Sequence, residues 1–167
     1  MTTDTNEGAP AGEIDPAVER RLAARLFNET WTLLEHTDRT PEDDNEMVHM
    51  AHASRYHWGQ VGEPRNLAIG EWQCSRVYAV LRRAEPALHH ARRELELAQR
   101  HRLGSFILAT AYEALARASA VAGDRGAFED YRRRAREAAA QIEDPEEREV
   151  AEGDIASLPP VVATRSP

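Results

Sequence analysis

Apolar residues recur with the period of an α-helix along nearly the whole of this sequence, and this spacing constrains the fold more than any other feature. No stretch shows the alternating β-branched residues that are typical of a strand. Short capping, proline-containing and glycine-containing segments interrupt the apolar spacing and mark helix starts and turns. They stand at Asp15-Pro16, Thr40-Pro41, Gly62-Glu63-Pro64, Ala84-Glu85-Pro86, Gly123-Asp124 and Asp144-Pro145. The sequence therefore predicts an all-α protein.

These interruptions divide the chain into six to seven helices. We expect them at about 16–35, 41–60, 64–83, 84–103, 105–122 and 126–142, with a short seventh helix from 145. Because the links between them are only a few residues long, consecutive helices must run antiparallel. This gives either an up-down bundle or a solenoid of helical hairpins. We expect one domain over 15–157, flanked by tails over 1–14 and 158–167 whose small and polar residues predict disorder.

Two of the predicted hairpins, over about 64–103 and 105–142, share features at a period near 40 residues. The second carries small and aromatic residues around a Gly-Asp turn: Tyr112, Leu115, Ala116, Gly123, Asp124, Phe128, Tyr131 and Ala135. The first carries Tyr78, Ala87, Leu88 and Ala91, with Arg82-Arg83 where the turn glycine would stand. This pattern over roughly 64–142 resembles the tetratricopeptide repeat family. The resemblance implies a helical-hairpin solenoid that recognises a peptide or protein on its concave surface.

The basic residues and the single cysteine exclude several function classes. All 21 basic residues are arginine, so the chain has no lysine for a P-loop or a Schiff base. Cys74 alone cannot form an internal disulfide or a Cys-x-x-Cys redox motif.

A net charge of −8 disfavours general nucleic-acid binding. The sequence has no recognisable signal peptide and no apolar run long enough for a membrane. We therefore expect a bacterial cytoplasmic protein without a nucleic-acid or membrane partner, and homodimer formation stays open.

The segment from Glu46 to Trp58 gathers the residues best suited to chemistry. It contains three of the seven histidines, and histidine is both a common metal ligand and a common acid or base. At about 100° per residue, His49, His52 and Tyr56 share one patch of a helix, whereas His57 points elsewhere. Glu71 flanks an apolar stripe of the next helix and is the expected carboxylate partner. The candidate ligand-binding residues are therefore His49, His52, Tyr56, His57 and Glu71.

Three interpretations of the segment from Glu46 to Trp58 stay open. In one, the histidines are packing residues that hydrogen-bond to neighbouring helices. In another, His49, His52 and Glu71 bind a divalent transition metal. The sequence disfavours a carboxylate-bridged di-iron centre, because the Glu46-x-x-His49 motif has no second copy in the chain.

The third interpretation is a pocket for an organic molecule or a peptide carboxylate, without a metal. Its polar groups would come from Tyr56, His52, Glu71, Gln73 and Arg76, and its apolar walls from Trp58 and Trp72. However, Glu71 and Tyr78 share one side of their helix, while Trp72 and Arg76 share a different side. These four residues cannot all line one cavity.

The roles that we expect for the other polar residues are simpler. We expect His90 and Glu94 on a solvated helix edge and Cys74 inside the core. The wet face of a terminal helix is expected to carry Arg132, Arg133, Arg134 and Arg136. Because no strong catalytic motif is present, the sequence predicts a non-enzymatic module that binds a protein or peptide and needs no cofactor. The alternative is a small helical metal-binding protein or enzyme that uses His49, His52 and Glu71.

Overall fold

The computed structural model describes residues 14–161, which form seven α-helices and no strand. The helices are α1 (Pro16–Glu35), α2 (Pro41–Val61), α3 (Pro64–Val80), α4 (Ala84–His101), α5 (Gly104–Ala122), α6 (Arg125–Ala139) and α7 (Pro145–Ala156). The all-α prediction is confirmed. Most of the two predicted tails lies outside the described residues. No helix within 14–161 combines the length and the apolar character that crossing a membrane requires.

Local side-chain caps explain why the helices begin where they do. At the start of α2, the Thr40 hydroxyl accepts the Asp43 amide, and the Asp43 carboxylate accepts the Thr40 amide in return. Asp15, Asp124 and Asp144 cap α1, α6 and α7 in a similar way. The predicted helix starts are confirmed to within one or two residues.

Two helices end about three residues earlier than predicted, α3 at Val80 and α6 at Ala139. After α3, Arg82 adopts a left-handed backbone with φ 57°, and its amide bonds to the Ala79 carbonyl. Gly123 ends α5 in the same conformation, with φ 77° and the equivalent hydrogen bond to Ala120. The first helices of the α3–α4 and α5–α6 hairpins therefore end in the same way, although only one of them uses glycine.

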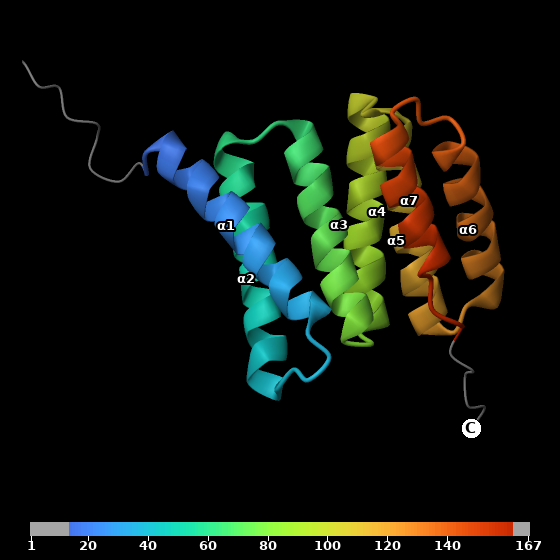
Figure 1. The fold of residues 1–167 in the computed structure, drawn as a ribbon, viewed down its shortest axis with the longest axis horizontal. Helices are drawn as coiled ribbons and strands as arrows, with labels where there is room; N and C mark the ends of the chain where they lie inside the picture. Colours follow the sequence, from blue (N-terminus) through green and yellow to red (C-terminus); the bar gives the residue numbers. More distant parts are fainter. Residues whose placement is uncertain (1–13, 162–167) are drawn as a thin grey trace, which may run out of the picture.

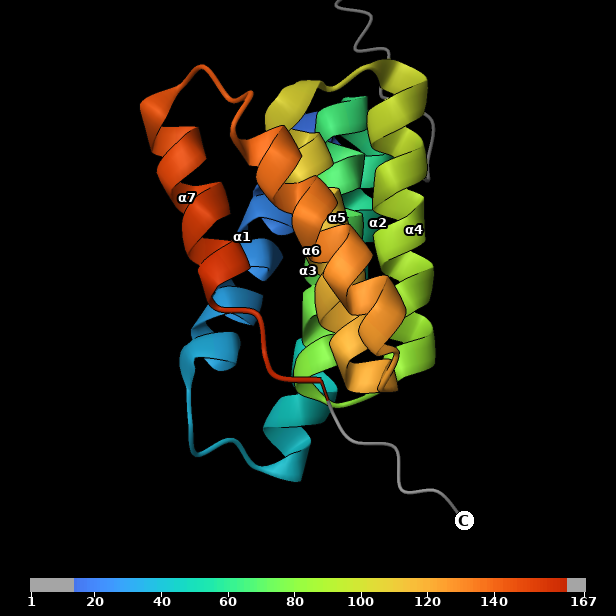
Figure 2. The ribbon, with the colours of Figure 1, turned by 90° about the vertical axis from the view of Figure 1, so that its right-hand side faces the viewer.

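The helices form three consecutive hairpins, α1–α2, α3–α4 and α5–α6, followed by α7. The first helices of the hairpins also pack on one another, α1 on α3, α3 on α5 and α5 on α7. Figures 1 and 2 show that α1 and α7 stand on the same side of the stack, with α3 set back between them. The result is a short, solenoid-like stack of hairpins.

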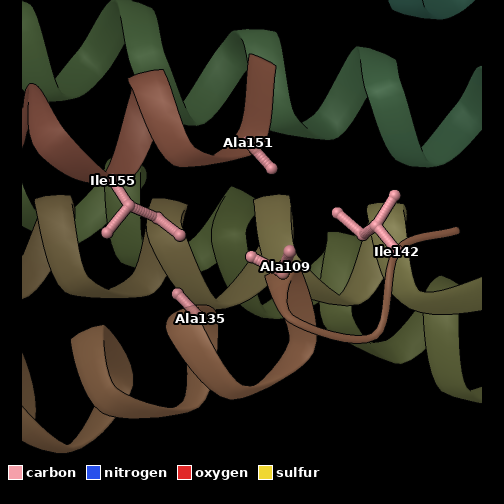
Figure 3. Packing of buried hydrophobic residues seen from close by; sticks show 6 residues of the cluster. Ala109, Ala135, Ile142, Ala151 and Ile155 are labelled. Atoms are coloured by element: carbon pink, nitrogen blue, oxygen red, sulfur yellow. The ribbon is translucent and has the colours of Figure 1, made fainter. Parts of the chain in front are cut away.

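α5 lies at the centre of this stack, as its apolar sequence predicts. Twelve of its residues are buried, and half of these are alanines, which allow neighbouring helices to approach closely. Figure 3 shows one such junction, where Ala109 of α5 meets Ala135 of α6 and Ile155 of α7. Leu158 continues the chain beyond α7 and packs against the same cluster.

Candidate functional site

The three tryptophans of the chain come from α1, α2 and α3, and two of them are in ring contact. The rings of Trp31 and Trp72 are tilted against each other with 5.5 Å between their centroids. Trp58 lines a cavity of about 160 Å³ together with Phe27 of α1 and Ile69 of α3. Trp31 and Trp72 come from different hairpins, so the hairpin stack itself brings their rings together.

One face of α3 continues from this cavity toward a larger one. Ile69, Trp72, Arg76 and Val80 follow each other at helical spacing, and Val80 lines a second cavity of about 410 Å³. Val121 of α5 and the chain segment Pro159–Val161 close the far side of that cavity. At 1.5 Å per residue, Ile69 and Val80 lie about 16 Å apart along the helix. We call this face of α3, with the two separate cavities at its ends, the α3 groove.

Ion pairs hold α7 against α3 beside the middle of the α3 groove. Arg76 contacts Asp154 of α7 at 2.6 Å, and its guanidinium lies 5.2 Å from the Trp72 ring centre. Arg65 contacts Glu147, one helical turn from the start of α7, at 2.7 Å. These contacts fix α7 beside the tryptophans without covering Val80, which is 39% exposed.

The side of α3 that faces α2 and α4 carries a separate polar cluster. The His90 Nδ1 atom of α4 lies 2.7 Å from the Glu71 carboxylate, and Arg55 of α2 donates to the other oxygen of Glu71 at 2.9 Å. The His52 Nε2 atom lies 2.9 Å from the Tyr78 hydroxyl. The prediction that Glu71 and Tyr78 lie apart from Trp72 and Arg76 is therefore confirmed.

Burial and neighbouring charges set the protonation of this cluster. Burial acts to raise the pKa of Glu71, but its hydrogen bond to His90 and the charge of Arg55 together hold that pKa below the ordinary value. Burial, followed by the nearby His90, lowers the pKa of His52. Burial also raises the pKa of the Cys74 thiol to about 12. Near neutral pH, the cluster therefore contains a carboxylate, a neutral His52 ring and a protonated thiol.

The sequence-predicted candidate residues divide into three groups. His52 and Glu71 meet in the polar cluster, through His90. His49 and Tyr56 lie at the surface, and Tyr56 is 63% exposed. Within their patch, His52 is the residue that contacts α3 and α4, through Tyr78 and His90. His57 turns to the other side and pairs with the buried Glu19 of α1.

The expectation that His90 and Glu94 form a solvated edge is wrong. Glu94 is 0% exposed and accepts a hydrogen bond from Thr110 of α5 at 2.8 Å. α4 packs on both α3 and α5, so it buries a second stripe beside its apolar one. His90, Glu94 and Leu97 recur at spacings of three and four residues, and that repetition is a sequence signal for the second stripe.

Together, the fold and the groove define a stack of helical hairpins with an aromatic groove along its middle. Comparison of the chain with known protein families, with curated proteins and with solved structures finds no match. The stack shows the coarser feature that the sequence resemblance implies, a succession of helical hairpins.

Proposed function

We propose that this protein is a non-enzymatic, tetratricopeptide-like module that binds an extended peptide or protein segment in the α3 groove. The observation that carries the proposal is the Trp31–Trp72 ring contact beside this groove, together with Trp58 in the cavity at one end of it. Tryptophan is enriched among the residues that dominate binding energy at interfaces, because it offers a large, rigid apolar surface. A stack of hairpins also presents the elongated surface that such modules use.

The two cavities define what kind of segment fits. They open at Ile69 and Val80, about 16 Å apart along α3. An extended chain advances about 3.3 Å per residue and its side chains alternate between two faces, so side chains about four or six residues apart share a face and come closest to reaching both cavities. Apolar residues line most of both cavities. The expected partner therefore presents two apolar side chains at this separation, in extended conformation.

Peptide selection followed by fluorescence titration tests the proposal. The full chain is immobilised, extended peptides are selected from a random display library, and binding is followed by intrinsic tryptophan emission. We expect enriched peptides with two apolar residues about four or six positions apart, on one face of the extended chain. Trp72→Ala should weaken their binding by about 30-fold or more, the loss that corresponds to roughly 2 kcal/mol at a dominant contact.

Two further variants serve as a second test and as a control. Val80→Asp places a charge at the other cavity, leaves the tryptophans intact and should weaken the same peptides. Tyr56→Ala removes an exposed aromatic group on the other side of α2 and should change binding by less than about twofold. Selection of no peptide, or of peptides that bind Trp72→Ala and Val80→Asp as well as the natural chain, would refute the proposal.

A further inference from the structure

Three helices bring two imidazoles and a thiol together on the side of α3 opposite the groove. His52 of α2, Cys74 of α3 and His90 of α4 each place one donor atom so that all three atoms lie within 4.8 Å of one another. The two imidazole rings have 5.1 Å between their centroids. Donors of one zinc ion lie roughly 3.5 Å apart, given bond lengths of about 2.0–2.3 Å. Modest side-chain rotations would therefore bring these three atoms onto one ion.

The hydrogen bonds around the two histidines are those that hold metal ligands in place. Glu71 accepts from His90 Nδ1, which leaves Nε2 of that ring free for an ion. Arg55 fixes the Glu71 carboxylate from the other side. The Tyr78 hydroxyl lies 2.9 Å from His52 Nε2, and the Tyr78 ring stacks on His90 with an interplanar angle of 7°. Both imidazoles are therefore oriented before any ion arrives.

Burial differs between the donors in a way that suits ion entry. Cys74 is fully buried against Met47 and Val77, whereas His52 and His90 are half-buried. The exposed His89 lies beside His90, with 5.1 Å between the ring centroids. An ion arriving from solvent would meet the imidazoles first and the sulfur last.

From this geometry we propose that His52, Cys74 and His90 bind a thiophilic d10 cation, zinc(II) or copper(I), with Glu71 as the positioning residue for His90. Two imidazoles and one thiolate suit this class of ion, whereas magnesium and calcium prefer oxygen donors. Binding converts the Cys74 thiol into a metal-bound thiolate, and the displaced proton goes to solvent. Three protein donors leave a fourth position for water or an external ligand.

Anaerobic titration of the purified full chain tests this site with the metals alone. Zinc(II) and copper(I) are each titrated against a competing chromophoric chelator, and cobalt(II) serves as a spectroscopic substitute for zinc. We expect one ion per chain and, with cobalt(II), a thiolate-to-metal charge-transfer band. His52→Ala, His90→Ala and Cys74→Ser should each weaken binding at least about 100-fold, and Glu71→Gln about 10- to 100-fold.

The neighbouring exposed histidines provide matched controls. His49→Ala and His89→Ala should leave the affinity within about twofold, because neither residue belongs to the donor set. A cooperative unfolding transition shows that a variant is folded. If Cys74→Ser does not fold, Cys74→Ala takes its place. Failure to bind one ion per chain would overturn the proposal. Binding that shows no charge-transfer band and depends on His49 or His89 would also overturn it.

Discussion

Three glutamates, Glu71, Glu94 and Glu113, are buried where α3, α4 and α5 meet, and their partners differ. Glu113 lies 2.6 Å from Arg117, and Glu71 contacts Arg55 and His90. Glu94 instead accepts one hydrogen bond from Thr110, and its Oε2 atom has no partner among the described residues. Burial without a direct cation raises the pKa of Glu94 well above its ordinary value, and the charges of Glu113 and Glu71 add to this rise.

The pH dependence of stability should therefore reveal Glu94. Because its pKa is raised in the folded state, the folded protein holds this proton more tightly than the unfolded chain does. The stabilising contribution of the proton is complete below the unfolded pKa of about 4.3 and is lost as pH rises toward the folded pKa. Glu94→Gln, which keeps the acceptor for Thr110, should raise the free energy of unfolding at pH 8 by about 1–3 kcal/mol.

Denaturant unfolding between pH 4 and pH 8 measures this effect. The difference between Glu94→Gln and the natural chain should shrink toward zero as pH approaches the unfolded pKa. Glu96→Gln on the exposed side of the same helix is the control, and its difference should stay small at every pH. A constant difference for Glu94→Gln across this range would contradict the buried-acid assignment.

At the scale of the helix, glycine decides how closely α2 and α3 approach. A Cβ atom added at Gly70 of α3 would lie 2.7 Å from Arg55 Cδ, 3.3 Å from its Cβ and 3.4 Å from its Cα. Contacts this short force either the Arg55 side chain or the α2 backbone to move. Since Arg55 also holds Glu71, this close crossing supports the polar cluster.

Glycine-to-alanine substitution should have opposite effects in α3 and α7. Gly70→Ala should lower the free energy of unfolding by about 1–3 kcal/mol, because the new methyl group overlaps Arg55. Gly153 of α7 has nothing within 4 Å of an added Cβ, so Gly153→Ala should raise stability by up to about 1 kcal/mol through helix propensity. Urea unfolding measures both. A gain in stability for Gly70→Ala would contradict the close crossing.

The helices could be predicted well from the sequence because their boundaries depend on local chemistry. The Thr40–Asp43 capping box and the Asp144-Pro145 start act within one turn, so the residues that form them are adjacent in the chain. The ends were harder to predict. Arg82 takes a left-handed conformation that favours glycine, so the residue type gives no signal for the turn at this position.

At the scale of the whole molecule, the candidate sites could be predicted only in part. The sequence places Glu71 and Trp72 on different faces of α3 correctly, because that follows from helical geometry alone. It does not show that α4 packs on two helices and thereby turns His90 toward Glu71 and His52. Nor does it show that Trp31 of α1 meets Trp72 of α3. Such contacts depend on how separate hairpins pack against one another, and no local sequence pattern predicts that packing.

The same docking implies that stability is graded along the stack. α5 packs on α3, α4, α6 and α7, whereas α7 ends the described stack and packs on α5 and α6. Ion pairs supplement the apolar contacts of α7 with Ala109 and Ala135. Arg117 of α5 also donates to the carbonyls of Asp154 and Ser157, at the end of α7.

Native-state hydrogen exchange should therefore show α7 opening before α5. We expect the slowest α5 amides to exchange only through global unfolding, and the α7 amides to exchange through a local opening of lower free energy. Because salt screens the partly exposed Arg65–Glu147 pair, 1 M salt should speed exchange in α7 more than in α5. Asp154→Asn, which removes the charge that Arg76 contacts, should lower the opening free energy of α7 by about 1 kcal/mol and leave α5 nearly unchanged. Equal opening free energies for the two helices would instead mean that the stack unfolds as one cooperative unit, in which charges at its end contribute no separate stability.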